Sequence, residues 1–261
     1  MKKLSRAKLS LIFIVVLLLL IAFGAVLALQ TRNQLAESAF TFSDVNNMKI
    51  DYWQSVFVSE LEPTPYDANE PRYTDAGNFN LIRTGITASD VYDYADLVVK
   101  VKATDDRSFS FRSILTKVII TEVYKGDRSV KSDEIYVYEW AEISLLRSYS
   151  PHGPSYNIMN TGDEYYLFLS RRPMPDGYIY TKKDQSEYLL ANVYMGKFNV
   201  ETSKEMQVLP DPESLIDWDQ VPDYQEVKSW DILPITHDQI EDYLSNREDA
   251  LALLHIEDGE R

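Results

Sequence analysis

Between residues 95 and 200, hydrophobic and polar side chains alternate along several short segments. In the first segment Leu97, Val99 and Val101 alternate with mostly polar neighbours, which is the period of two typical of a half-buried strand. Similar patterns predict further strands at residues 111–124, 134–140, 164–170 and 192–200, and a hairpin between 178–181 and 188–191. The pattern therefore predicts a mainly β domain.

The second of these segments, residues 111–124, is too long for a flat strand. Its apolar positions change face between Ile120 and Val123, which indicates a β-bulge or strong coiling. Long, bent strands are typical of small closed barrels. We therefore expect residues 87–209 to form one small β-barrel.

Two helices are predicted at the ends of this domain. Thr87 and Asp90 have the spacing of a capping box and predict a short helix over residues 88–94. A second capping pattern at residues 236–239, followed by an apolar stripe, predicts a C-terminal amphipathic helix that is interrupted near Asn246. Between the barrel and this helix, residues 210–234 are acidic and rich in proline. We expect residues 210–234 to form a strap over the barrel, with Trp218 and Trp230 buried. The last part of the chain, residues 210–261, then consists of this acidic strap and the C-terminal helix.

An apolar run in the N-terminal region predicts a membrane anchor. Residues 9–29 carry no charge and are long enough, as a helix, to cross the hydrocarbon core of a bilayer. Four basic residues precede this segment and only Arg32 follows it closely, which places residues 1–8 in the cytoplasm and the rest outside the cell. A signal peptide cleaved near Ala28 is the alternative, although apolar cores of signal peptides are usually only about 7 to 15 residues long. Residues 30–86 are then a juxtamembrane segment and N-terminal extension, which begins either with a juxtamembrane helix at 33–40 or with a stalk.

Charge and composition argue against several classes of function and of site. The net charge is −15, and beyond the N-terminal basic residues it is −19, which argues against nucleic acid as a partner. The sequence has no Cys, so a disulfide framework, a thiolate metal site and a Cys nucleophile are all excluded. The three His residues lack metal-ligand spacing, the acidic residues lack a calcium-loop pattern, and no nucleophile motif is present. We therefore predict no cofactor, no metal and no catalytic residues.

The candidate site residues are aromatic or lie in a predicted loop. The segment 134–140 places Ile135 and Val137 on one face and aromatic side chains on the other, and residues 147–160 read as a loop. Such side chains can stack on sugar rings or on a peptide, or can simply pack against the barrel. The candidates for partner binding are Tyr136, Tyr138, Trp140, Tyr149, His152 and Tyr156.

Four short motifs carry a resemblance to a known group of proteins. They are Ala-Asp-Leu-Val-Val at 95–99, Val-Tyr-Lys-Gly at 123–126, Gly-Asp-Glu-Tyr-Tyr-Leu-Phe-Leu at 162–169 and Gly-Lys-Phe at 196–198. The segment resembles exported or membrane-anchored bacterial proteins and, more distantly, netrin-like modules such as the tissue inhibitors of metalloproteinases. The resemblance implies an OB-like barrel of five strands in Greek-key order. Inhibition in that family depends on an N-terminal Cys that binds zinc, so this activity is not implied for a chain without Cys.

Taken together, these observations predict a single-pass protein of the cell membrane with an extracytoplasmic binding module. The partner is expected to be an envelope protein or a wall polymer, in addition to the membrane itself through residues 9–29. The alternative is a hydrolase of the cell envelope or a glycan-binding protein.

Overall fold

A computed structural model describes residues 24, 45, 48–50, 64–65, 83–84, 86–110, 113–130, 133–143, 149–151, 155–171, 179, 186–201, 206–210 and 220–259. The chain divides into two compact units, Met1–Thr41 and Phe42–Arg261, and all of the described residues except Gly24 belong to the second. The predicted membrane helix at 9–29 lies outside the described residues except for Gly24, which is helical. Within the described ranges, no helix is both long and apolar enough to cross a membrane.

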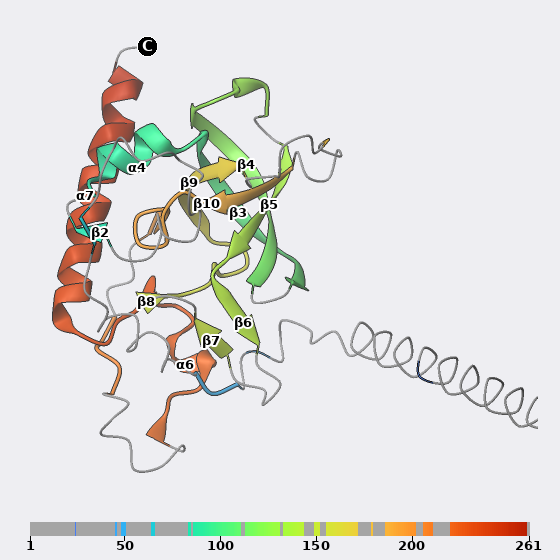
Figure 1. Cartoon of the computed structure of the whole chain (residues 1–261), viewed down its shortest axis with the longest axis vertical. Coiled ribbons are helices and arrows are strands. Elements are labelled where there is room, and N and C mark those ends of the chain that lie inside the picture. The colour runs from blue at the N-terminus through green and yellow to red at the C-terminus, as the bar shows by residue number, and fades with distance from the viewer. Residues whose placement is uncertain are drawn as a thin grey trace, which may run out of the picture. The chain divides into compact units, whose positions relative to one another are not determined.

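The second unit is mainly β and is built on a closed barrel of five strands (Figure 1). The strands are β3 (Leu97–Ser110), β4 (Ser113–Lys125), β5 (Glu134–Glu139), β9 (Glu164–Arg171) and β10 (Glu187–Leu190). Antiparallel pairing joins β5 to β4, β4 to β3, β3 to β9 and β9 to β10, and a parallel pair of β10 with β5 closes the circle. The first strand of the predicted hairpin lies outside the described residues except for Ile179, and β10 pairs with β5 and β9 instead.

The predicted bulge in the long second strand is confirmed. In the pairing of β4 with β3, Thr121 is an extra residue between Ile120 and Glu122, and Tyr124 is a second extra residue of the same kind. Each extra residue bends the strand and increases its twist, which lets β4 curve around the barrel. Gly126 then turns the chain with a φ of 101°, a backbone conformation that side chains other than that of glycine rarely adopt.

The barrel interior is filled by alternate residues of every strand. Val99 and Leu167 are cross-strand partners in β3 and β9, and neither side chain is exposed. The inward residues of β5 are Ile135, Val137 and Glu139, which are all buried. The middle of the barrel interior is therefore apolar, and the carboxylate of Glu139 lies in the interior at the end of β5.

The strand predicted at 192–200 is only half confirmed. The strand β11 (Lys197–Asn199) pairs with β9, whereas residues 192–196 form a turn, so that the prediction is wrong for this half. The Asn192 side chain explains the turn, because its Oδ1 accepts hydrogen bonds from the backbone N–H groups of Tyr194 and Met195. The backbone at Gly196 passes close to this turn, since a Cβ there would lie 2.1 Å from the carbonyl oxygen of Asn192.

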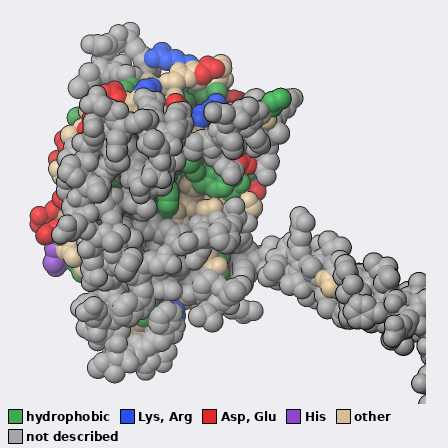
Figure 2. All heavy atoms as spheres, in the orientation of Figure 1, with side chains coloured by type: hydrophobic (Ala, Val, Ile, Leu, Met, Phe, Trp, Pro, Cys, Tyr) green, Lys and Arg blue, Asp and Glu red, His purple; other side chains and the backbone are tan. Residues whose placement is uncertain are grey.

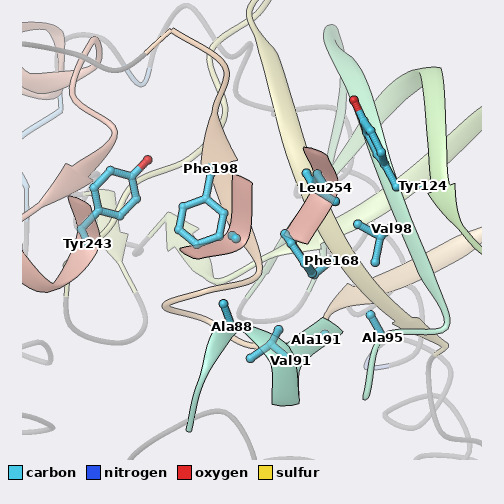
Figure 3. Packing of buried hydrophobic residues seen from close by; sticks show 11 residues of the cluster. Ala88, Val91, Ala95, Val98, Tyr124, Phe168, Ala191, Phe198, Tyr243 and Leu254 are labelled. Atoms are coloured by element: carbon cyan, nitrogen blue, oxygen red, sulfur yellow. The ribbon is translucent and has the colours of Figure 1, made fainter. Parts of the chain in front are cut away.

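Two helices pack against the outer face of the barrel and against each other (Figure 1). Helix α4 (Ala88–Tyr94) is the predicted short helix, and its capping box between Thr87 and Asp90 is present. Helix α7 (His237–Gly259) lies beside it. Figure 3 shows the apolar layer between helices and barrel, in which Phe168 and Phe198 meet edge to face at 6.1 Å. The buried members are Ala88, Val91, Ala95, Val98, Tyr124, Phe168, Ala191, Phe198, Tyr243, Ala250 and Leu254.

Helix α7 is continuous, so the predicted interruption near Asn246 is wrong. A single Asn in a helix interior costs only a fraction of about 1 kcal/mol relative to Ala, too little to end a helix that is held by packing. Arg247 provides a further tie, because its guanidinium donates to the carbonyl oxygens of Asn199 (3.1 Å) and Val200 (2.8 Å). These bonds fasten α7 along the edge of β11.

The predicted acidic strap contains short regular elements in its described part. Helix α6 (Tyr224–Val227) buries both terminal side chains, and β12 (Ile232–Leu233) pairs with β8 (Ser155–Tyr156). Trp218 lies outside the described residues, and Trp230 is half-buried, so that the burial predicted for Trp230 is only partial. The remaining elements are β1 (Thr64–Pro65), β2 (Arg83–Thr84), the 3₁₀ helix η1 (Arg128–Val130), β6 (Ala141–Ile143) and β7 (Tyr149–Pro151).

Candidate functional site

A buried carboxylate lies at one end of the barrel interior. Glu139, the last inward residue of β5, accepts hydrogen bonds from the Thr116 hydroxyl, the Tyr156 hydroxyl (3.0 Å) and the backbone N–H of Met159 (2.6 Å). It also forms an ion pair with Arg107 of β3 at 3.5 Å, and both side chains are buried. Four donors to one carboxylate satisfy most of its acceptor capacity, which offsets the cost of its burial.

A buried lysine lies close to this carboxylate. The register of β11 places Lys197 opposite Leu167, so both side chains point to the interior side of the sheet. The Lys197 ammonium donates to the carbonyl oxygen of Asn157 and lies 4.6 Å from the ring centre of Tyr156 and 5.5 Å from that of Tyr165. Burial lowers the pKa of Lys197 to about 8, although the charges of Glu139 and Asp231 oppose this shift.

The charged groups of this interior balance one another. Arg107 and Lys197 carry two positive charges, and Glu139 and the buried Asp231 carry two negative ones. The same environment raises the pKa of the Tyr165 hydroxyl through burial, and the hydroxyl accepts a hydrogen bond from the backbone N–H of Asn160 at 2.7 Å. We refer to Arg107, Glu139, Lys197 and Asp231 as the charged cluster.

A cavity of about 100 Å³ opens beside the charged cluster, beneath helix α7. Lys197, Asp231 and Tyr156 line it from the barrel side, while Tyr194 and Val193 come from the turn before β11. Helix α7 contributes four residues at helical spacing, so that one face of the helix forms a wall. These four are Gln239, Asp242, Tyr243 and Asn246, and the remaining lining residues are Asn157 and Ile232.

Of the aromatic candidates predicted at 134–140, Tyr136 and Tyr138 lie on the outer face of β5, and Trp140 directly follows the end of this strand. Tyr136, Tyr138 and Trp140 are all half-buried. Tyr138 donates to Glu187 of β10 at 2.7 Å, and the ammonium of Lys117 lies 5.7 Å from the ring centre of Tyr136. These two tyrosines therefore share one surface that runs across β4, β5 and β10.

The other three candidates are not part of that surface. Tyr156 is buried beside the charged cluster. The side chain of Tyr149, in β7, and the whole of His152 lie outside what the structure describes. The segment predicted as a loop at 147–160 is partly core, because residues 156–159 are buried and held by the hydrogen bonds to Glu139, Lys197 and α6.

Sequence reasoning did not find the charged cluster or the cavity. A signal was present for Glu139, which continues the inward alternation of Ile135 and Val137. For Lys197 the signal was the opposite, because an apolar Phe198 between Lys197 and Asn199 predicts that Phe198 points inward. In the described ranges, no group of three or more acidic or His side chains is arranged to hold a metal ion.

Comparison with known proteins does not assign the chain to a family. No protein-family model matches the sequence, and no curated protein matches it either.

Proposed function

We propose that this protein is a single-pass membrane protein whose OB-type barrel is an extracytoplasmic binding module for an envelope protein or a wall polymer. The observation that carries the proposal is the order of strands around the barrel, β3-β4-β5-β10-β9, with one parallel pair between β5 and β10. Five strands closed in a Greek-key barrel are the arrangement of OB folds. The anchor in this proposal is the apolar segment at residues 9–29.

The proposed binding surface is the outer face of β4 and β5, which is the face through which OB folds bind oligonucleotides and oligosaccharides. Ile119 of β4 is 36% exposed, and Tyr136 lies on the same face of the neighbouring strand, opposite Lys117. Lys117 forms ion pairs with Asp106 (2.7 Å) and Glu134 (3.1 Å), so the apolar groups are framed by charges. In Figure 2, hydrophobic side chains reach the surface in the region where Figure 1 places β5.

The charge of the chain favours a protein or a neutral polymer over an anionic partner. The part of the chain beyond the basic N-terminus carries a net charge of −19, which repels nucleic acid and anionic polymers. A surface with an exposed isoleucine, two tyrosines and paired charges suits a protein surface or a sugar chain, because both offer apolar patches and hydrogen-bonding groups.

A crosslinking pull-down from intact cells tests this proposal, with the full chain tagged after Arg261. We expect the wild-type chain to capture one envelope protein or wall polymer specifically, and the variant Ile119→Ser with Tyr136→Ala to lose at least about two-thirds of it. Leu244→Ser on α7 is the matched control, since Leu244 is 39% exposed but lies away from this face. Equal capture by both variants would exclude the β4–β5 face, and no specific capture by the wild type would overturn the proposed function.

A further inference from the structure

We infer that the cavity beneath α7 binds a single neutral sugar ring. This inference rests on the proposed function, because it identifies the chemical class of a wall ligand. It concerns a different site from the β4–β5 face, and the two can be tested separately.

The charge balance around the cavity favours a neutral ligand. The two positive groups of the charged cluster, Arg107 and Lys197, are already matched by Glu139 and Asp231. The further carboxylate of the lining, Asp242, belongs to an exposed residue, where water screens its charge. An anion or a cation bound against this cluster would bring a buried charge without a partner, which is unfavourable. A neutral ligand with many hydroxyl groups avoids this cost and still forms hydrogen bonds.

The polar groups that line the cavity offer both donors and acceptors at short intervals. Lys197 can only donate and Asp242 can only accept, whereas Asn246 does both. Gln239 uses its Oε1 to accept a hydrogen bond from the backbone N–H of Ile235 at 2.7 Å, so its amide NH₂ serves as a donor. Sugar hydroxyls both donate and accept, and a mixed lining of this kind matches them better than it matches a carboxylate or an ammonium ion.

The apolar part of the lining supplies the second element of sugar recognition. Tyr156, Tyr194 and Tyr243 line the cavity together with Val193 and Ile232. Aromatic rings provide large, rigid apolar faces with a polar edge, and the C–H face of a sugar ring packs against such surfaces. A pocket with aromatic walls and a few convergent polar groups is the usual form of a small-molecule site.

The wall formed by α7 is held in place independently of any ligand. The ring of Tyr243 packs against Phe198 with 5.7 Å between ring centres, and Arg247 bonds the edge of β11. Asn157 holds the floor of the cavity in place. Its side-chain amide donates to the carbonyl oxygens of Val227 (3.1 Å) and Trp230 (2.8 Å), and its backbone carbonyl oxygen accepts a hydrogen bond from Lys197. A preformed site binds without a large ordering cost. The cavity has a volume of about 100 Å³, which is room for several water molecules or for one edge of a sugar ring.

The test is a binding titration of the full chain in detergent micelles, by saturation-transfer NMR, with four probes: glucose, N-acetylglucosamine, sodium acetate and methylammonium chloride. We expect one of the two sugars to bind with a Kd on the order of 1 mM and the two ions to bind at least about tenfold more weakly. The variant Asp242→Ala with Asn246→Ala removes two hydrogen-bonding groups from the cavity and should weaken sugar binding about tenfold or more. Glu241→Ala with Ser245→Ala is the matched control, since these exposed residues have the same spacing on α7 but do not line the cavity.

Three results would overturn the inference: no binding of either sugar, tighter binding of acetate or methylammonium, or equal sugar affinity in the cavity variant and its control. The variant Ile119→Ser with Tyr136→Ala keeps the two proposals apart, because it should leave sugar binding unchanged even though it reduces capture of the partner. Conversely, a chain that binds sugar but captures no partner would retain the sugar site in the cavity and overturn the proposed capture of an envelope protein or wall polymer.

Discussion

The buried ammonium of Lys197 is the residue whose chemistry depends most on the surrounding fold. It lies over two tyrosine rings, donates to the Asn157 carbonyl and faces the carboxylates of Glu139 and Asp231 and the guanidinium of Arg107. Nothing local distinguishes Lys197 from the exposed lysines, because burial of a charge is decided by partners that are distant in the sequence. For this reason the charged cluster could not be predicted, although the alternation along β5 correctly indicates that Glu139 points inward.

The burial of Lys197 predicts a dependence of stability on pH. In the folded state its pKa is about 8, below the ordinary value of 10.5, so between these values the folded chain binds fewer protons than the unfolded chain. Stability therefore rises with pH across this window, and the cost of the buried charge is fully present below pH 8. We expect the free energy of unfolding of the wild type, minus that of Lys197→Met, to increase by about 2 kcal/mol from pH 7 to pH 10.

Urea unfolding of both proteins at a series of pH values measures this difference. The subtraction removes the titration of all other groups that the two proteins share. A difference that stays constant between pH 7 and pH 10 would show that Lys197 is hydrated in the folded state.

At the scale of elements, the features that could be predicted are those that local chemistry determines. The capping box of α4 lies within four residues, and the bulges of β4 follow from a change of face along one segment. The turn at 192–196 could not be predicted although its cause is also local, because an Asn inside an apolar run is compatible with both a strand and a turn. The pairing of β10 with β5 was not predictable, since it joins segments about fifty residues apart.

Two turn glycines provide a matched pair for an experiment. Gly126 and Gly162 both have positive φ angles, of 101° and 92°. A Cβ at Gly162 would meet no atom within 4 Å, whereas one at Gly126 would lie 2.9 Å from the carbonyl oxygen of Asp96. We expect Gly162→Ala to lower the free energy of unfolding by about 1 kcal/mol through backbone strain alone, and Gly126→Ala to lower it by at least about 1 kcal/mol more. Thermal unfolding of the two variants decides this, and equal losses would contradict the steric argument.

At the scale of the whole molecule, the second unit has an apolar layer on each side of the sheet. One layer is the barrel interior around Val99 and Leu167, and the other is the outer layer that α4 and α7 cover. The mainly β class and the two flanking helices could be predicted, because a period of two and helix caps are visible in the sequence. The β-barrel was also predicted, from the long and bent second strand, and is confirmed, whereas the pair of β10 with β5 that closes it is visible only in the three-dimensional register.

This architecture predicts that one buried charge in the barrel interior disrupts the fold. Val99→Asp places a carboxylate in a fully buried apolar position, at a cost of several kcal/mol, which is comparable to the entire stability of a domain. Lys102→Asp is the control, at an exposed position of the same strand. It changes the net charge of the protein more than Val99→Asp does, but it leaves the barrel interior intact. Circular dichroism and protease resistance should show an unfolded Val99→Asp protein and a folded Lys102→Asp protein. A folded Val99→Asp protein would refute the assignment of this face to the interior.

The parallel pair of β5 with β10 also determines when the protein can acquire its fold during synthesis. The strands β3, β4 and β5 follow one another along the chain and can pair as soon as residue 139 has been made. The barrel closes only when β10 arrives at residues 187–190, and α7 must still follow. At elongation rates of about 5–20 residues per second, the nascent chain spends several seconds with the edge of β5 open. During that interval an open edge invites pairing with other chains, so nascent chains stalled before residue 187 should depend on chaperones, whereas the completed protein should not.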